Sequence, residues 1–537
     1  MLTFLGNTDI LYSYKFICKL SRSIIFMVTR FPQTLSIIKV SSESDVKFIF
    51  NNPHCTKNDA SRLKRIFEII SYPFIIFLES NYIDKVYRDS YYTFFSNKHI
   101  DLERNCTRIS IFNDTSLTLN IEDFSQKNEE ILKEHFVGSI VLRPLSGCFI
   151  GRTLLDPSKL HIAASYIRTT SFNHILYGHE FSIDAFPFSS QDSETMTCAE
   201  TSVWSILEYY GTRYPEYRTI LPSNMIKKLE DMSYERNLPS RGLTYQAVTA
   251  LLKTFWFSPR LYAREVYKNK DDCEAKSFRR VFHYYIESGI PIALGIKRKN
   301  NVSGTEENHS IVAIGHTKQR IMSKAERLGD LPFINTADLY NEYIIMDDNS
   351  IPYNVEQYDK FSIFNNGKAA CFSVPLYKRI FMEAKDAEDI IYELLRTPSL
   401  QKKIKDIIPV NDSAPLMVRI YLTSSRKYKK LRGRLSTSLE AAAFYQQLTY
   451  PKFLWVAELT TEEKYNDEEI YGEIVLDATA DRNNPEDSII CMRFLSSFSY
   501  RMPNESVTVL KDFHKFADTS ANNTYKMYKN NLNEGGF

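Results

Sequence analysis

The sequence predicts an α+β protein in which a helical half is followed by an antiparallel sheet in the middle of the chain. At 537 residues and 62.6 kDa the chain is longer than one hydrophobic core usually serves, which indicates several domains. Its 43% hydrophobic and 25% charged residues are typical of a globular protein. Helical periodicity gives way to short β-branched runs after Gly289. We therefore expect three α+β domains, at residues 1–180, 181–375 and 376–537.

The N-terminal domain, residues 1–180, mixes short apolar alternations with one helical stretch. A helix is expected near Ser61–Ile70, and GSIVLRPL, residues 138–145, is typical of a strand that ends in a turn. NHILYGHE, residues 173–180, holds two histidines in a strand-like segment without further clustered ligands, so we expect no metal there. No residue of this domain indicates its role.

The middle domain opens with four helical segments. In TCAETSVWSILEYYG the apolar residues recur at helical spacing, and Gly211 is a natural residue to follow the helix end. Trp204 is expected to pack in the core against the sheet. Three more segments show the same periodicity: residues 224–232, 243–255 and 277–288.

Three strands are expected to follow these helices. GIPIALGI (289–296), HSIVAIGH (309–316) and EYIIMDDN (342–349) are short, rich in β-branched residues and bounded by polar turns. Such consecutive strands are typical of a mainly antiparallel sheet.

The C-terminal domain, residues 376–537, is expected to combine a helix at 386–396 with strands at 453–459 and 472–480. Its basic run SSRKYKKLRGR, residues 424–434, is the strongest local cluster of charge. We interpret it as a solvated loop rather than a phosphate-binding patch. The role of this domain is not indicated by its sequence.

Composition excludes several function classes. The 67 basic and 65 acidic residues leave a net charge of +2, which gives no reason to expect a nucleic acid partner. The eight cysteines are scattered singly, which favours reduced thiols and a cytoplasmic protein, or one exported without a recognisable signal peptide. SIIFMV, residues 23–28, is too short to span a membrane. Neither a HExxH nor a nucleotide-binding glycine motif occurs, so we expect no metal and no cofactor.

Cys198 is the candidate nucleophile. It lies at the expected start of a helix, where unpaired backbone N–H groups and the helix dipole favour a negative charge and therefore a thiolate. A lone cysteine is more often a small buried apolar residue, but the polar loop that precedes Cys198 favours the nucleophile.

A cysteine nucleophile needs a base and a group that orients the base. His309 begins one expected strand, and Asp347 and Asp348 end another, so that neighbouring strands would bring them together. Strand side chains alternate between faces, so only one aspartate would face the imidazole, and the sequence leaves the choice open. Gln191, in the loop before Cys198, is expected to stabilise an oxyanion together with the Cys198 backbone N–H. His316, at the far end of the histidine strand, is expected to be structural.

These residues and their order resemble the papain-like cysteine peptidases, and in particular the bacteriocin-leader peptidase-like branch. The shared features are a glutamine loop leading to a cysteine helix that ends in EYYG, the segment ESGIPIALGI, the strand HSIVAIG, and a final apolar strand that ends in aspartate. The resemblance covers about Pro187–Tyr353. It implies a papain-like middle domain that hydrolyses a peptide or isopeptide bond of a protein or peptide substrate through a thioester acyl-enzyme.

Two alternatives remain at this point. The same triad serves deamidases, transglutaminases and other acyltransferases, because all of them pass through an acyl-enzyme. A catalytically inactive papain-like scaffold used for binding is the second alternative. The sequence does not indicate the substrate or the oligomeric state.

Overall fold

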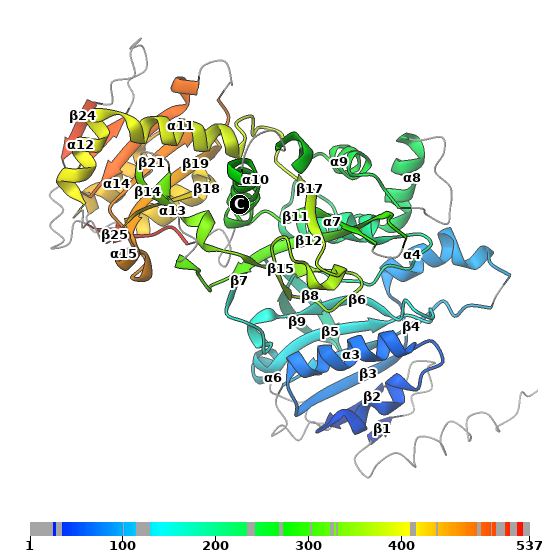
Figure 1. Cartoon of the computed structure of the whole chain (residues 1–537). Helices are drawn as coiled ribbons and strands as arrows, with labels where there is room; N and C mark the ends of the chain where they lie inside the picture. Colours follow the sequence, from blue (N-terminus) through cyan, green and yellow to red (C-terminus); the bar gives the residue numbers. More distant parts are fainter. Residues whose placement is uncertain are drawn as a thin grey trace, which may run out of the picture.

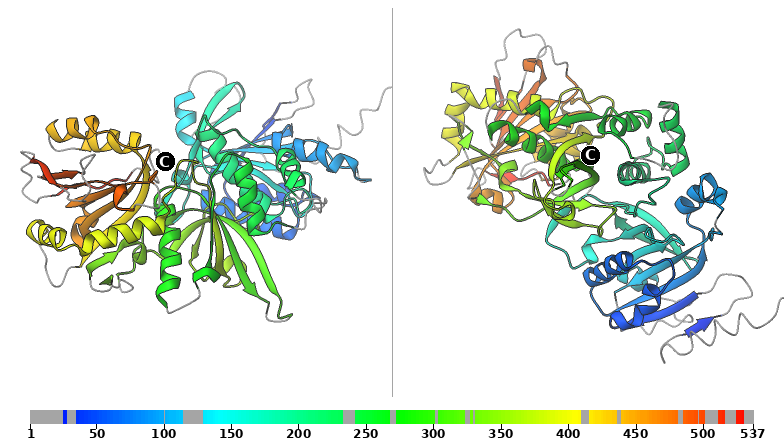
Figure 2. Two further views of the ribbon diagram at one scale, coloured as in Figure 1. Left: turned by 90° about the horizontal axis from the view of Figure 1, so that it is seen from above. Right: turned by 45° about the vertical axis from the view of Figure 1, so that its right-hand side comes forward.

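A computed structural model describes most of the chain as an α+β structure (Figure 1), as the sequence predicts. The residues that it describes are 25–27, 35–99, 101–113, 129–232, 242–267, 272–300, 303–322, 327–328, 331–408, 415–435, 439–480, 485–495, 497–500, 511–515 and 524–529. The N-terminal part, blue to cyan, and the C-terminal part, yellow to red, lie on either side of a green middle part, and both views of Figure 2 agree. Within the described residues, no helix is long and apolar enough to cross a membrane.

The N-terminal part is built on a six-stranded antiparallel sheet. Its strands follow chain order: β1 (Ile25–Met27), β2 (Leu35–Val40), β3 (Phe74–Tyr82), β4 (Cys106–Phe112), β5 (Phe136–Leu142) and β6 (Ile150–Leu155). The hairpin β8 (Thr170–Leu176) and β9 (His179–Ala185) packs against one face of this sheet.

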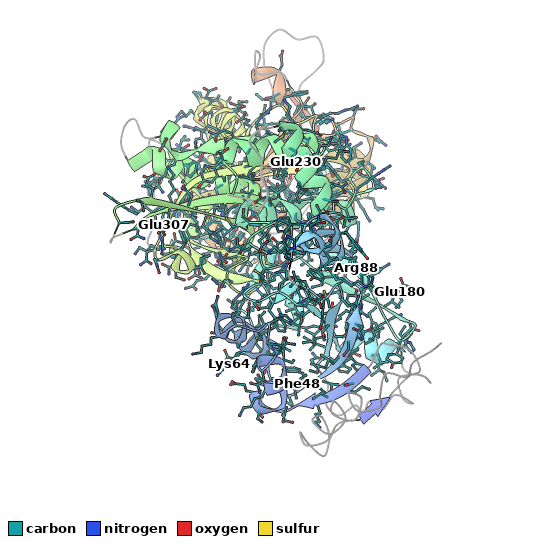
Figure 3. The ribbon with its side chains drawn as sticks, turned by 90° about the vertical axis from the view of Figure 1, so that its right-hand side faces the viewer. Phe48, Lys64, Arg88, Glu180, Glu230 and Glu307 are labelled. Atoms are coloured by element: carbon teal, nitrogen blue, oxygen red, sulfur yellow. The ribbon has the colours of Figure 1, made fainter. Side chains whose placement is uncertain are left out.

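Helix α3 (Lys57–Ile70) packs against the N-terminal sheet and includes the helix expected near Ser61–Ile70. It begins at a capping box in which the Asp59 carboxylate accepts the Thr56 backbone N–H at 3.2 Å. The shorter helices here are α2 (Lys47–Phe50), α4 (Lys85–Thr93) and α6 (Glu129–His135). Figure 3 labels Phe48 and Lys64 at this end of the molecule, and Glu230 and Glu307 on the middle part.

All four predicted helices of the middle part are present. They are α7 (Cys198–Arg213), α8 (Pro222–Met232), α9 (Tyr245–Thr254) and α10 (Asp272–Glu287). The expected end at Gly211 is wrong, because α7 continues to Arg213. A Cβ at Gly211 would lie 2.3 Å from the Thr219 backbone nitrogen, so this glycine permits a close approach of the following loop instead of ending the helix.

The three predicted strands of the middle part also form, and they belong to an antiparallel sheet. The sheet runs β10 (Arg260–Ala263), β17 (Lys368–Val374), β11 (Ile292–Lys299), β12 (Glu306–Thr317), β15 (Glu342–Met346) and β16 (Asn354–Gln357). Strand β7 (Ser165–Ile167), which precedes the helices in the chain, pairs with the end of β12.

The C-terminal part is built on an eight-stranded sheet. Its order is β13 (Arg327–Leu328), β14 (Leu331–Asn335), β18 (Leu416–Ser424), β19 (Phe453–Thr461), β21 (Gly472–Asp477), β22 (Ile489–Phe494), β23 (Ser497–Tyr500) and β24 (Lys511–Lys515). A separate pair joins β20 (Glu469–Ile470) to β25 (Tyr525–Lys526). The helices are α11 (Ala384–Arg396), α12 (Pro398–Ile407), α13 (Ser425–Leu435), α14 (Leu439–Gln447) and α15 (Glu462–Asn466).

The basic run 424–434 is not the expected loop, because it forms helix α13. Tyr428 and Arg432, spaced by four, point inward and are almost fully buried. The Arg432 guanidinium contacts the carboxylates of Glu458 and Glu473, which neutralise it inside the protein. Arg426, Lys430 and Arg434 are exposed, and the charge of the run alone had indicated a loop.

The middle sheet is buried on both faces. One face packs, together with Trp204 and the rest of α7, in an apolar cluster that continues into the N-terminal sheet. The other face packs against α10 in a cluster that continues into β18 and β19. Neighbouring residues of one strand alternate between the two clusters, as Val312 and Ala313 do. Strand β12, which carries His309, is therefore held from both faces of the sheet.

Candidate active site

Cys198 is the first residue of α7. The Glu200 carboxylate accepts hydrogen bonds from the backbone N–H, at 3.2 Å, and from the hydroxyl of Thr197, so the helix starts at a fixed residue. Backbone N–H groups of a first helical turn have no partner within the helix. The partly exposed thiol of Cys198 thus lies at the positive end of a 16-residue helix.

The structure brings His309 and Asp347 together with Cys198. His309 lies on β12, opposite Ile296 of β11, and its Nε2 is 2.7 Å from Oδ1 of Asp347. The Cys198 side chain lies close enough to the imidazole to raise its pKa. Because Nε2 is used by Asp347, Nδ1 is the nitrogen left for the thiol. Three residues far apart in the chain therefore meet in one row.

Two serines fix the distance between α7 and β12. The Ser202 hydroxyl, one helical turn after Cys198, donates to the Cys198 carbonyl at 2.8 Å. The Ser310 hydroxyl, adjacent to His309, donates to the Ser202 oxygen at 3.2 Å. The nucleophile-bearing helix and the histidine-bearing strand are thus linked through one short polar bridge.

His309 is held in its charged form. Burial alone would lower the pKa of His309, but hydrogen bonds to Asp347 and Cys198 and the charges of Asp347 and Asp348 outweigh burial and raise it to about 11. The side chain is only 6% exposed, and the Phe364 ring covers it with a centroid distance of 5.4 Å. An imidazolium shielded from water next to a thiol favours the thiolate.

Asp347, and not Asp348, is the aspartate that faces the His309 imidazole. Burial would raise the pKa of Asp347, but the hydrogen bond and charge of His309 and the Asn349 backbone N–H, at 3.0 Å, lower it. Asp348 lies farther away, with Oδ1 at 3.6 Å from the His309 Nε2. Asp347 therefore orients the imidazole and carries the compensating negative charge.

Asp348 is a buried carboxyl group of a different kind. Among the described residues neither of its carboxylate oxygens accepts a hydrogen bond. Burial, followed by the negative charge of Asp347, raises the pKa of Asp348 to about 8. A protonated Asp348 is able to donate to Asp347, whereas two carboxylates would repel each other. At neutral pH the pair therefore carries one negative charge.

Arg62 clamps the turn that carries both aspartates. This buried residue of α3 donates from Nη2 to the Asp348 carbonyl at 2.6 Å and from Nε to the Ser350 carbonyl at 2.9 Å. The N-terminal part of the protein thus helps to position the turn. Sequence reasoning missed Arg62, because nothing in a helix near residue 60 indicates a contact 286 positions away.

Gln191 is not brought to the Cys198 backbone N–H as expected. Its side-chain amide donates to Asn349 Oδ1 at 3.2 Å, and no contact with Cys198 is found among the described residues. The physical reason lies in the loop after Gln191. There, Asp192 Oδ1 accepts three backbone N–H groups, from residues 194–196, and winds the loop into a tight turn that directs the amide toward Asn349.

Tyr245 is a second residue that sequence reasoning missed. It begins α9, and burial followed by the charges of Cys371 and Cys198 raises the pKa of its hydroxyl, which places the ring near the nucleophile. The ring crosses β11 at Gly295, where a Cβ would lie 2.0 Å from it. The only signal in the sequence would have been a glycine within an apolar strand.

Among the described residues, two groups of side chains have metal-ligand spacing. The donor atoms of His309, Asp347 and Asp348 lie within 4.8 Å of one another. A metal there would have to replace the bond between His309 and Asp347. The second group combines His283, Glu287 and His316, but Glu287 already accepts from His316 at 2.9 Å and from Arg419 at 2.7 Å. That contact gives His316 a structural partner in the protein interior.

The site therefore combines a thiol at a helix start, a buried imidazolium and a carboxylate that orients it. This set is able to form a covalent bond to an electrophilic carbon, with the imidazolium as proton donor. Six cysteines are free thiols: Cys55, Cys106, Cys148, Cys198, Cys371 and Cys491. Neither a protein-family model nor a curated protein sequence matches this chain.

Proposed function

We propose that this protein is a papain-like cysteine peptidase that hydrolyses a peptide or isopeptide bond. The observation that carries the proposal is the row formed by Cys198, His309 and Asp347, in which Nε2 of the imidazole is 2.7 Å from the carboxylate and the Cys198 side chain is near enough to raise the pKa of the imidazole. Nucleophile, base and orienting group are each on the element that acyl transfer requires.

The fold assignment is supported by the order of the elements around this row. Helices α7 to α10 precede the antiparallel strands β11, β12 and β15, and α7 packs against the sheet with its first residue beside β12. This is the helical half followed by a sheet half that the resemblance to papain-like peptidases implies. The singly scattered cysteines favour a reducing compartment such as the cytoplasm, or export without a recognisable signal peptide.

The reaction proceeds in two steps. The Cys198 thiolate attacks the scissile carbonyl, and the His309 imidazolium gives its proton to the leaving amine as the C–N bond breaks and a thioester forms. Neutral His309 then takes a proton from water, which attacks the thioester and releases the acid and the thiolate. Asp347 holds the ring in place in both steps.

The oxyanion that forms in each step needs hydrogen-bond donors. The Cys198 backbone N–H is one, because a first-turn N–H has no partner within the helix. The Gln191 amide joins it only after leaving Asn349, to which it donates at 3.2 Å in the resting enzyme. We infer that substrate binding releases this amide.

Activity-based labelling with an electrophilic peptide-like probe tests the proposal. The parent should be labelled at Cys198, and Cys198→Ala and His309→Ala should both lose the label. Cys55→Ala is the matched control, because Cys55 is a second partly exposed thiol. This substitution should leave the labelling of Cys198 unchanged.

Labelling that survives Cys198→Ala would contradict the assignment. Labelling in the presence of a chelator tests whether His309, Asp347 and Asp348 hold a metal ion instead. Chelation should leave the labelling unchanged if the aspartates interact with His309 and not with a metal. Mass spectrometry of products formed with and without an added amine distinguishes hydrolysis from acyl transfer through the same acyl-enzyme.

A further inference from the structure

A cavity lies at the other end of the nucleophile's helix. It has a volume of about 480 Å³ and opens between the C-terminal end of α7 and the first turn of α13. Tyr210 lines it and lies twelve residues after Cys198, which is about 18 Å along the helix axis. The cavity is therefore separate from the catalytic row. Its volume falls in the range of ~300–1,000 Å³ that is common for small-molecule sites.

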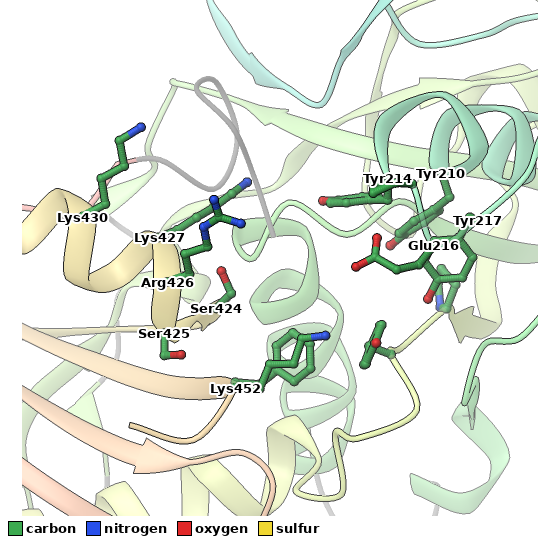
Figure 4. A pocket seen from close by; sticks show the side chains of 14 residues that line it. Tyr210, Tyr214, Glu216, Tyr217, Ser424, Ser425, Arg426, Lys427, Lys430 and Lys452 are labelled. Atoms are coloured by element: carbon green, nitrogen blue, oxygen red, sulfur yellow. The ribbon is translucent and has the colours of Figure 1, made fainter. Parts of the chain in front are cut away.

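One wall of this cavity is cationic. Arg426, Lys427 and Lys430 of α13 line it together with Lys452, which precedes β19 (Figure 4). Among the lining residues, all within the described part of the chain, Glu216 is the only carboxylate. The N-terminal end of α13, an 11-residue helix, adds a positive partial charge to this wall.

The surroundings of Lys427 disfavour its charged form. Burial, followed by the charges of Arg168, Arg213, Arg426 and Lys430, lowers the pKa of Lys427 to about 7. Arg168 and Arg213 come from outside α13 and do not line the cavity, so the positive charge around Lys427 is not confined to one helix. A bound anion would offset this repulsion.

The opposite wall is aromatic. Tyr214 stacks on Tyr210 with a centroid distance of 5.6 Å, and the ring of Tyr217 stacks on Phe257 at 4.4 Å. Figure 4 shows these tyrosines across the cavity from the basic side chains of α13. Stacked rings of this kind offer a flat apolar surface to a planar ligand. Anion recognition and ring recognition thus face each other in one cavity.

We propose that this cavity binds an aromatic phosphate, a nucleoside phosphate, with its base against the tyrosines and its phosphates against the cations of α13. Either wall alone would suit a simpler ligand, but only a molecule with both a planar ring and several negative charges uses both walls. The site joins α7 of the middle part to α13 of the C-terminal part, so the bound ligand bridges the two. It does not depend on the function proposed for Cys198.

Binding is tested by calorimetry and by thermal unfolding of the full-length protein with ATP. ATP should bind the parent and raise its unfolding temperature, whereas adenosine and tripolyphosphate should each bind at least about tenfold more weakly, a loss of about 1.4 kcal/mol. The double variant Arg426→Glu/Lys430→Glu changes two exposed side chains and should weaken ATP binding by at least as much.

Lys402→Glu is the charge control, because Lys402 is exposed on α12 and does not line the cavity. It should bind ATP like the parent, as should Cys198→Ala. Tripolyphosphate binding as tightly as ATP would overturn the aromatic part of the proposal. The site itself would be overturned if ATP did not bind at millimolar concentration. It would also be overturned if Lys402→Glu and the double variant lost the same factor in affinity for ATP.

Discussion

Asparagine substitutions at Asp347 and at its neighbour Asp348 should have opposite effects, because the two carboxyl groups are held in different protonation states. Asp347 is ionised and accepts from His309 at 2.7 Å, whereas burial and the charge of Asp347 raise the pKa of Asp348 to about 8. Both substitutions keep side-chain size and remove one possible charge. The pair is therefore a matched test of which aspartate orients the imidazole.

Asp347→Asn removes the charge that stabilises the imidazolium. A hydrogen bond between charged groups contributes ~1.5–3 kcal/mol, and loss of a buried partner costs ~3 kcal/mol or more. A loss of ~3 kcal/mol from the transition state for thiolate attack corresponds to about a hundredfold slower reaction. We expect Cys198 alkylation near neutral pH to slow by about that factor.

Asp348→Asn should stabilise the protein. The unfolded carboxyl group ionises near its usual pKa of 3.8, whereas the folded group stays protonated up to about 8. Because the folded pKa is raised, the parent loses stability as pH rises from about 4 to about 8. At pH 7 this cost is on the order of 4 kcal/mol, and asparagine avoids it while still donating to Asp347.

Two measurements on purified protein decide the matter. Alkylation by iodoacetamide, followed at the Cys198 peptide by mass spectrometry, reports the thiolate, and urea unfolding at pH 4 to 8 reports the free energy of unfolding. Slow alkylation in Asp348→Asn with normal alkylation in Asp347→Asn would show that Asp348 orients His309. A stability gain in Asp348→Asn that is the same at pH 4 and pH 8 would refute the protonation argument.

Three further predictions concern residues around the row. Arg62→Met should lower the free energy of unfolding, measured in urea, by ~3 kcal/mol, because two carbonyls lose a charged donor. The control is Arg65→Met, at an exposed position on the same helix, which should change the free energy of unfolding by less than about 0.5 kcal/mol. Gly295→Ala should destabilise by ~1–3 kcal/mol, since its Cβ would overlap the Tyr245 ring, and a second substitution Tyr245→Ala should recover part of that loss in the same assay. Gln191→Ala should lower kcat on a peptide substrate by ~10²-fold and leave the iodoacetamide alkylation of Cys198 unchanged. A kcat equal to that of the parent would show that the Gln191 amide stays hydrogen-bonded to Asn349.

Local features of the site could be predicted from the sequence. The helix start at Cys198 follows from a threonine N-cap and a glutamate three residues later, and both act within one helical turn. The strands with His309 and before Asp347 follow from short β-branched runs. The basic run at 424–434 shows the limit of such reasoning, since its charge indicated a loop and the burial of Tyr428 and Arg432 makes it a helix.

The sequence by itself determined where the helices and the three predicted strands of the middle part lie and that Cys198 begins a helix, because periodicity and capping act between neighbours in the chain. Only the tertiary structure decided that Asp347 meets His309, that Arg62 holds the aspartate turn and that Gln191 faces Asn349. Those contacts join positions up to 288 residues apart and depend on strand register and on the packing of helices against the sheet. A shift of one residue in register would reverse which aspartate faces the imidazole, and no local pattern encodes that register.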